Sequence, residues 1–174
     1  INLCADGPAG PLGTVTLGLD SEAGLLCEAT YPDEVAALRG PDVRLCELTK
    51  LAVDQSDFNK HIMASLFHIA YIYARVINER TTLLIEVNPR HVAFYVRALG
   101  FEVAGPERQC ERASAPAVLL KLSLEHAERQ IKRLGGRGSQ WPSKSIYAYC
   151  FSSHEEDGIV RRIRTLTEAA NDVA

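Results

Sequence analysis

The sequence predicts an α/β or α+β fold in which helices flank one central mixed β-sheet. Strand patterns and helical patterns follow one another along the chain, which is the arrangement that such folds require. Two strand–helix–strand steps predict parallel pairing near the centre of the sheet. With 174 residues, of which 47% are hydrophobic, the chain can bury an ordinary core as one domain.

The first half of the chain is predicted to contain three strands and two helices. Residues 13–20 alternate apolar and polar side chains, which indicates a strand, and residues 25–31 are predicted as its return strand. Pro32 stands at the first turn of a short helix. A further strand is predicted at residues 44–54, and an apolar stripe in residues 57–78 indicates a long helix.

The second half continues with the same alternation of patterns. Apolar and β-branched residues predict a strand at residues 81–87. Residues 88–101 are predicted to form a helix, with Asn88 as its N-cap, Pro89 at its first position and Gly100 at its end. The remaining predicted elements are strands at 101–105 and 115–124, a basic helix at 125–136, a strand at 145–151 and an amphipathic helix at 155–170.

Composition and charge exclude several classes of protein. The formal net charge of -3 and the pI near 6.0 provide no basic field that would attract nucleic acid. The five cysteines are scattered, without CxxC or Cys/His ligand spacing, which favours a reducing cytoplasm and predicts no metal site. The most apolar run, residues 62–77, contains His68 and Arg75 and is too short to span a bilayer.

The start of the chain carries an expectation of its own. The sequence begins at Ile1 rather than at a methionine, and it shows no signal peptide. We expect that upstream residues were removed or are not represented.

The strand at residues 44–54 has three polar residues in its middle, Glu47, Thr49 and Lys50. Burying a carboxylate is costly unless the group is paired, and burial raises its pKa toward neutrality, which suits a general base. Glu47 is therefore a candidate base, with a structural pair to an arginine or a solvated face as the alternatives. Strict alternation places Glu47 and Thr49 on one face with Leu45, Leu51 and Val53, and Lys50 on the other face with Cys46, Leu48 and Ala52.

Glu86 lies in the next predicted strand, and it flanks Glu47 if the two strands are neighbours. Two carboxylates beside one cleft can divide the roles of base and of amine binding. The alternative is a structural ion pair between Glu86 and Arg90 or Arg97.

A resemblance to a known family rests on three segments of the sequence. Residues 87–101, "VNPRHVAFYVRALGF", resemble the strand–helix segment of the Gcn5-related N-acetyltransferase superfamily. With residues 24–54 and 115–124, the pattern is similar to one branch, the long-chain N-acyl amino acid synthases, which are related to the acyl-homoserine lactone autoinducer synthases. The resemblance implies the acyltransferase-like sheet of that superfamily. The first strand and two helices of that fold are expected to be missing from this sequence.

The resemblance also implies a reaction, in which an amide forms between a fatty acyl thioester and the α-amine of an amino acid. Glu47 matches the acid that takes a proton from the attacking amine, directly or through water, and Thr49 matches a Ser/Thr position near the reacting carbonyl. Lys50 stands where the family more often has arginine, so a bidentate contact becomes a single-point contact. Tyr95 matches a tyrosine that protonates the leaving thiolate, with a packed helix aromatic as the alternative.

The implied donor is an acyl-phosphopantetheine thioester on an acyl carrier protein, with no tightly bound cofactor. Relatives that use coenzyme A hold its pyrophosphate on a glycine-rich turn, whereas residues 54–67 contain no glycine. The expected donor contacts are the backbone of Leu51, Ala52 and Val53 and the side chains of Asn88, Arg90 and His91. For Asn88 and His91 the alternatives are helix capping and simple exposure to solvent.

Leu66, Phe67 and Ile69 are predicted to line an acyl pocket, with ordinary core packing as the alternative. Basic residues in the helices at 125–136 and 155–170 are candidates for docking an acidic carrier protein, or they are solvated helix faces.

Two parts of the chain are distinguished. Residues 1–135 are predicted to be the acyltransferase core, and residues 136–174 a C-terminal extension of a strand and a helix that packs on the core. The helix of this extension is expected to cap the acyl tunnel or to form a contact in a homodimer.

The predicted function is that of a bacterial, cytoplasmic N-acyltransferase whose partners are an acyl carrier protein and an amino acid or similar amine. One alternative is an autoinducer-synthase-like enzyme that acylates another amine, such as a lactone-forming or polyamine acceptor. Another is a non-catalytic module that binds acyl chains or carrier protein. The presence of Glu47 and Thr49 favours chemistry over binding alone.

Overall fold

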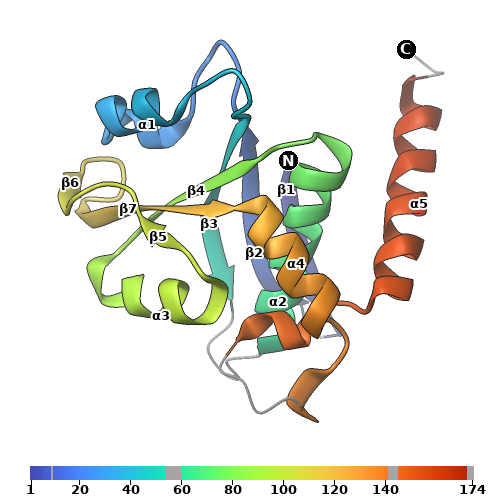
Figure 1. Ribbon diagram of the computed structural model, residues 1–174. Coiled ribbons are helices and arrows are strands. Elements are labelled where there is room, and N and C mark those ends of the chain that lie inside the picture. The colour runs from blue at the N-terminus through green and yellow to red at the C-terminus, as the bar shows by residue number, and fades with distance from the viewer. Residues whose placement is uncertain (9, 54–59, 141–144, 172–174) are drawn as a thin grey trace.

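The computed structural model describes residues 1–8, 10–53, 60–140 and 145–171 of the chain. Within these residues seven strands form a mixed sheet in the order β1-β2-β3-β4-β7-β5, and β6 pairs with β7 (Figure 1). β3 and β4 are parallel, and the other described pairs are antiparallel. The strands are β1 Asn2–Gly7, β2 Gly10–Leu19, β3 Leu45–Val53, β4 Thr82–Val87, β5 Glu102–Val103, β6 Arg108–Cys110 and β7 Ala115–Ser123.

Helices cover both faces of this sheet, as the sequence predicts. The α-helices are α1 Pro32–Leu38, α2 Lys60–Tyr71, α3 Pro89–Leu99, α4 Leu124–Leu134 and α5 Ser153–Asn171. The short elements are the 3-10 helices η1 Leu26–Ala29, η3 Gly138–Gln140 and η4 Ile146–Tyr149, and the π-helical segment η2 Ile72–Ile77 that continues α2.

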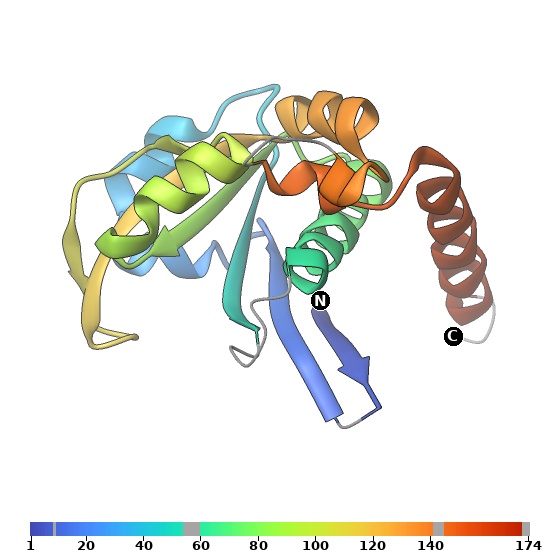
Figure 2. The same cartoon turned by 90° about the horizontal axis from the view of Figure 1, so that it is seen from below.

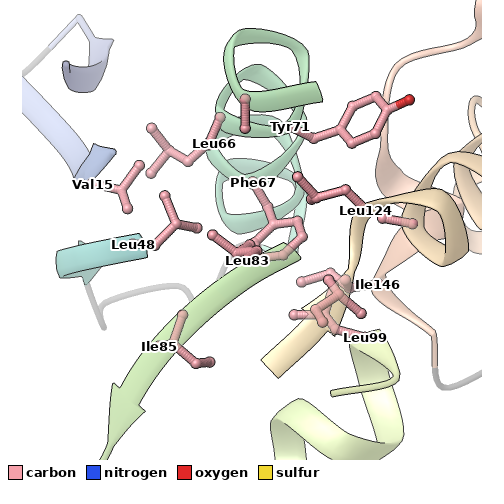
Figure 3. Close-up of a cluster of buried hydrophobic side chains, with 14 of the residues drawn as sticks. Val15, Leu48, Leu66, Phe67, Tyr71, Leu83, Ile85, Leu99, Leu124 and Ile146 are labelled. Atoms are coloured by element: carbon pink, nitrogen blue, oxygen red, sulfur yellow. The ribbon is translucent and has the colours of Figure 1, made fainter. Parts of the chain in front are cut away.

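Two apolar clusters hold the layers together. The larger cluster packs α2, α4, η4 and the end of α3 against one face of the sheet (Figure 3). The smaller cluster packs η1 and α1 against the opposite face, where Leu45, Leu84 and Leu119 are buried. α5 contacts η2, at the side of the molecule away from α1 (Figure 2). Among the described helices, none is both long and apolar enough to cross a membrane.

β3 and β4 separate before either strand ends. Their parallel pairing runs from Leu45 opposite Thr82 to Leu48 opposite Ile85, although β3 continues to Val53 and β4 to Val87 (Figure 1). On the other edge of β3, a bulge interrupts the pairing with β2 between the pairs Thr16–Thr49 and Thr14–Ala52. Lys50 lies in this bulge with a φ of 54°, a left-handed conformation that is uncommon for a residue with a side chain. The bulge bends β3 away from β4 and opens a gap in the sheet.

The bulge also corrects the predicted faces of β3. Leu45 packs in the smaller cluster, and Leu48 packs in the larger one, as strict alternation requires. Leu51 and Val53 then pack against the larger cluster with Leu48, not on the face of Leu45 and Glu47. Strict alternation was wrong here because the extra residue at the bulge shifts the period of the strand by one position.

Most of the elements predicted from local pattern are confirmed. Asn88 accepts a hydrogen bond from the N–H of Arg90, Pro89 is the first residue of α3, and Gly100 ends the helix with a φ of 78°. The confirmed strands and helices are those expected at 13–20, 44–54, 81–87, 101–105, 115–124, 125–136 and 155–170, the short helix after Pro32, and the described part of the helix at 57–78.

Two predicted strands are wrong, because side chains turn the backbone into 3-10 helices. In residues 25–31, the carboxylate of Glu28 accepts the N–H of Leu25, and η1 follows. In residues 145–151, the hydroxyl of Ser145 accepts the N–H of Tyr147 at the start of η4. β1 and β6 were not predicted. Of the two expected parallel pairs only one forms within the described residues, since β7 lies between β4 and β5.

The residues after α4 pack closely on the preceding elements. The hydroxyl of Tyr147 donates a 2.8 Å hydrogen bond to the carbonyl of Leu99 at the end of α3. The fully buried His68 of α2 accepts the N–H of Phe151 at Nδ1, so its Nε2 is the nitrogen that donates to Glu156 of α5, at 3.2 Å. The division of the chain at residue 135 stays a prediction.

The Tyr147 contact predicts a loss of stability in the variant Tyr147→Phe. The change removes one hydroxyl and leaves the buried carbonyl of Leu99 without this donor, so the free energy of unfolding should fall by about 1–3 kcal/mol. Denaturant unfolding followed by circular dichroism measures this change. Tyr149→Phe, on the same 3-10 helix, is the matched control, since the ring keeps its contacts with His61 and Lys60 when the hydroxyl is removed. Equal stability of the two variants would contradict the role of the hydrogen bond.

Candidate active site

The gap between β3 and β4 joins two cavities. One cavity, of about 270 Å³, lies toward α2 and α3, and the other, of about 370 Å³, lies toward η1 and the β6–β7 hairpin. The two cavities therefore meet at the gap, one on each face of the sheet. Six residues line both cavities, three from β3, two from the end of β4 and the N-cap residue of α3: Leu48, Thr49, Lys50, Glu86, Val87 and Asn88.

The cavity toward α2 and α3 has a mainly apolar wall. Its deep side belongs to the larger core cluster, where the side chains of Val15, Leu48, Phe67, Ile85 and Leu99 gather (Figure 3). Its further lining residues are Leu51 and Met63, with the polar His91 and Tyr95 on the side of α3. An apolar wall with a few polar groups at the mouth suits a ligand with a hydrocarbon chain and a polar head. We call this space the apolar cavity.

The second cavity differs because it contains an ion pair. Arg112, on the turn between β6 and β7, donates a hydrogen bond from Nη2 to Oε2 of Glu86. Small and apolar residues make up much of the remaining wall, namely Leu26, Ala113, Ala115, Pro116 and Ala117. We call this space the ion-pair cavity.

Glu86 occupies the junction of the two cavities. Its side chain is only 9% exposed, and Oε1 has no hydrogen-bond partner among the described residues. The expected pairing with Arg90 or Arg97 is wrong, because Arg90 contacts His91, Arg97 contacts the carbonyl of Ala93, and Arg112 takes the carboxylate. Burial lowers the pKa of Arg112, but the charge of Glu86 and the other contacts outweigh it and raise that pKa overall.

Glu47 is buried away from both cavities. It is 3% exposed, and its two oxygens accept the N–H groups of Leu26 at 2.6 Å and Cys27 at 3.0 Å, at the start of η1. Glu47 is thus paired with backbone N–H groups, and the expected alternative of an arginine partner is wrong. The residue opposite Glu47 on β2 is Gly18, which provides space for the Glu47 side chain, because a Cβ there would lie 3.1 Å from Cγ of Glu47. The carboxylate fastens η1 to the sheet, and Leu26 of η1 lines the ion-pair cavity.

The two carboxylates lie on one face of neighbouring strands, as the sequence predicts. Glu47 stands opposite Leu84 in the β3–β4 pairing, and Glu86 follows two residues later on the same strand face as Leu84. Cys27 is close to both. Burial, together with the charge of Glu47, raises the pKa of the Cys27 thiol well above its ordinary value, so this cysteine is not a thiolate nucleophile.

Some of the residues predicted to bind the donor line a cavity, and others do not. Thr49 and Lys50 line both cavities, and Leu51 lines the apolar cavity. Ala52 and Val53, farther along β3, line neither. Asn88 caps α3 and lines both cavities, His91 lines the apolar one, and the exposed Arg90 lines neither, donating instead to Nε2 of His91 at 3.1 Å.

Tyr95 faces the apolar cavity from α3, between the edges of Phe94 and Phe101. Burial raises the pKa of its phenol above the ordinary value, so Tyr95 keeps its proton near neutral pH. The side chain can therefore donate a proton or a hydrogen bond.

The residues predicted for the acyl pocket also take different places. Phe67 lines the apolar cavity. Leu66 points toward Gly13 of β2, where a Cβ would lie 3.0 Å from its Cδ1, and Ile69 is a half-buried residue packed against the core. Of the stretch at residues 54–67 that lacks glycine, residues 54–59 lie outside the described residues. No group of three or more metal-binding side chains occurs in the part of the chain that the structure describes.

Sequence reasoning missed Arg112 and Met63. Arg112 lies on a turn whose flanking strand β6 is only three residues long, so nothing local indicated a hairpin that returns to Glu86. Met63 lies one helical turn before Phe67 on α2, and the helical period placed it on the same face.

Comparison with known proteins gives consistent likenesses. The family model for the N-acyl amino acid synthase FeeM matches residues 1–123. The solved structure of FeeM, an N-acyl amino acid synthase from uncultured soil microbes, is 28% identical with a TM-score of 0.65, and the match covers 71% of this chain and 72% of FeeM. Comparison with curated proteins gave no match.

Two acyl-homoserine lactone synthases share the fold at lower identity. LasI is 16% identical with a TM-score of 0.53, and the coenzyme A-dependent BjaI is 13% identical with a TM-score of 0.54. The matches cover 71% and 74% of this chain, and this chain spans 64% of LasI and 61% of BjaI.

The contacts of Glu47 predict that Glu47→Gln lowers stability. The glutamine amide turns an N–H donor toward one of the two backbone N–H groups, so one charge-assisted hydrogen bond is lost and a donor is left unpaired. The free energy of unfolding should fall by about 2 kcal/mol. Urea unfolding measures it, with Glu79→Gln, an exposed partner of Arg44, as control. Full stability combined with lost turnover would instead identify Glu47 as the proton acceptor that the resemblance implies.

Proposed function

The chain belongs to the N-acyl amino acid synthase FeeM family, and we propose that it moves a long-chain acyl group from an acyl-carrier-protein thioester to the α-amine of an amino acid. Membership of this family makes the protein an amide-forming acyltransferase. The observation that carries the proposal is the gap between β3 and β4, where an apolar cavity and an ion-pair cavity share their lining residues. A donor and an acceptor entering from opposite faces meet in that gap.

The apolar cavity is the proposed donor side. Beyond Leu48 the edge of β3 that faces β4 is released from strand pairing, so its backbone N–H and C=O groups are available to a pantetheine arm. The residues proposed for this contact are Leu51, Ala52 and Val53. The apolar wall around Met63, Phe67 and Leu99 suits the hydrocarbon chain.

The reacting carbonyl is proposed to lie in the gap beside Thr49. Backbone N–H groups of β3 freed by the end of the ladder can hold the oxyanion as negative charge develops. The amine nitrogen attacks the carbonyl carbon, the C–N bond forms and the C–S bond breaks. Tyr95, which keeps its proton because of its raised pKa, supplies a proton to the leaving thiolate.

The choice of an acyl carrier protein as donor rests on the sequence. Residues 54–67 lack the glycine-rich turn that holds the pyrophosphate of coenzyme A, and the pantetheine arm of a carrier protein needs no such turn. Asn88, His91 and Arg90 at the start of α3 are proposed to face the donor's phosphate or the carrier. BjaI, a structural neighbour, is described as coenzyme A-dependent, so both donors belong in the test.

The setting proposed for this reaction is the bacterial cytoplasm. All five cysteines are free, which suits a reducing compartment. No tightly bound cofactor is proposed, and the acyl-phosphopantetheine thioester acts as a substrate. α5 is proposed to cap the cavity or to form a homodimer contact.

The experiment that tests this function combines two thioester donors with a panel of amines. The protein is incubated with lauroyl–acyl carrier protein or lauroyl-coenzyme A, and with each amino acid, homoserine lactone or a polyamine, and amides are identified by mass spectrometry. N-acyl amino acids formed faster from the carrier-protein donor are expected. Amides of the lactone or the polyamine alone would indicate the autoinducer-synthase-like alternative, and binding of the carrier protein without any amide would indicate a non-catalytic module.

The assigned donor side predicts the effect of narrowing the apolar cavity. In Met63→Phe a rigid ring replaces a flexible chain in the cavity wall, so turnover with lauroyl donors should fall at least tenfold relative to butyryl donors. The ratio of the two rates is measured within one variant, so a loss of folded protein cancels. Leu66→Phe overpacks the same helix outside the cavity wall and should leave the ratio unchanged. An equal shift in both variants would favour an acyl chain beside Leu66.

A further inference from the structure

The carboxylate of Glu86 is half satisfied in a buried position. Oε2 is bound by Arg112, while Oε1 has no partner among the described residues, and the side chain is 9% exposed. An acceptor of a charged group that is buried without a donor is destabilising. A ligand that brings a hydrogen-bond donor to Oε1 would satisfy this group. Because Glu86 lines both cavities at the gap, that donor arrives next to the reacting carbonyl.

Within the described structure, Arg112 has unused hydrogen-bond donors, whereas Glu86 has an unused acceptor. A guanidinium carries five N–H donors, and in the described residues Arg112 directs only Nη2 at partners, Glu86 and the sulfur of Cys110. Its side chain is 41% exposed and lines the ion-pair cavity, so a ligand in that cavity can reach the remaining donors. An external carboxylate can bind there in the bidentate manner that arginine favours.

The pair thus offers a free acceptor and free donors side by side, which is the complement of an α-amino acid zwitterion. We propose that Glu86 and Arg112 recognise the acyl acceptor, Glu86 Oε1 binding the α-ammonium group and Arg112 the α-carboxylate. This inference rests on the proposed function and names the residues that bind its acceptor. The apolar remainder of the wall, including Leu26 and Pro116, selects an amino acid with an apolar side chain.

Glu86 also accounts for the proton that must leave before the amine can attack. The ammonium group gives one proton to Oε1 of Glu86, and the free amine then adds to the thioester carbonyl. As the C–S bond breaks, Tyr95 protonates the sulfur, which leaves as a thiol, and the second proton of the nitrogen restores the phenol of Tyr95. Glu86 returns its proton to solvent, so thioester and ammonium yield amide, thiol and one proton.

Lys50 is the competing cation, since it is exposed and also lines the ion-pair cavity. Its single ammonium binds a carboxylate as a point charge, whereas Arg112 is already fixed in direction by Glu86. The two assignments are separated by substituting each residue.

The test compares acceptors that differ only in the carboxylate. L-phenylalanine and L-phenylalaninamide share amine and side chain, and the donor is the lauroyl thioester that gives the faster reaction. Arg112→Gln should lower kcat/KM for phenylalanine about 10- to 100-fold, mainly through KM, and change that for the amide by less than about threefold. Arg44→Gln, which breaks an exposed Arg–Glu pair at the opposite end of β3, should change neither. Lys50→Gln should not alter the ratio.

A second variant separates binding of the carboxylate from removal of the proton. Glu86→Gln retains the shape but cannot take a proton, so kcat should fall about 10²- to 10⁴-fold for both acceptors. The residual rate should rise tenfold per pH unit, in proportion to the unprotonated amine, until the pKa of the acceptor's amine is reached. A flat pH profile with near-normal kcat would overturn the role of Glu86.

The outcomes distinguish this inference from the proposed function. Equal losses for phenylalanine and its amide in folded Arg112→Gln, or a changed ratio in Lys50→Gln instead, would overturn the recognition pair while amide synthesis stands. If no donor and amine give an amide, the proposed function fails. Calorimetric titration of the full chain with L-phenylalanine then still decides the inference: binding that Arg112→Gln weakens supports the site, and binding that it leaves unchanged, or no binding, refutes it.

Discussion

The early end of the β3–β4 ladder is the constraint on which the rest of this structure depends. A sheet that kept pairing beyond Leu48 and Ile85 would bury the edges of both strands in hydrogen bonds, and the two faces would be sealed from one another. The left-handed backbone of Lys50 costs conformational energy, and the bulge around it bends β3 out of the ladder. What the protein gains is a gap lined by polar side chains and unpaired backbone, at the place where the proposed donor and acceptor meet.

The carboxylates of Glu47 and Glu86 lie on one face of the sheet but differ in role, because they contact different groups. Both oxygens of Glu47 are occupied by backbone N–H groups, which makes this residue a fixed acceptor that anchors η1. Glu86, two residues past the position opposite Glu47, has one oxygen held and the other unpartnered within the described structure. Position in the sheet is almost the same for both, so the difference in chemistry comes from what each carboxylate contacts.

Local rules predicted much of the fold, and non-local contacts account for the rest. Asn88, Pro89 and Gly100 mark the ends of α3 because capping depends on neighbouring residues alone. The contact of Glu47 with η1 joins residues about twenty positions apart, and that of Arg112 with Glu86 spans 26 positions. A local sequence pattern therefore cannot predict either contact. The presence of acids in β3 and β4 was readable, whereas the partner that decides their role was not.

The wall of the apolar cavity depends on chain that lies beyond the part matched by the family model, which ends at residue 123. Leu99 lines the cavity, and its carbonyl is held by the hydroxyl of Tyr147, while Ile146 packs beside Leu99 in the same cluster (Figure 3). His68, one residue after the lining Phe67, is bonded to Phe151 and Glu156. Because α2 and α3 are thus braced from behind, the space between them is shaped by the C-terminal segment as much as by the sheet. If the apolar cavity holds the acyl chain as proposed, a change of sequence there alters the length of chain admitted without changing any residue of the gap.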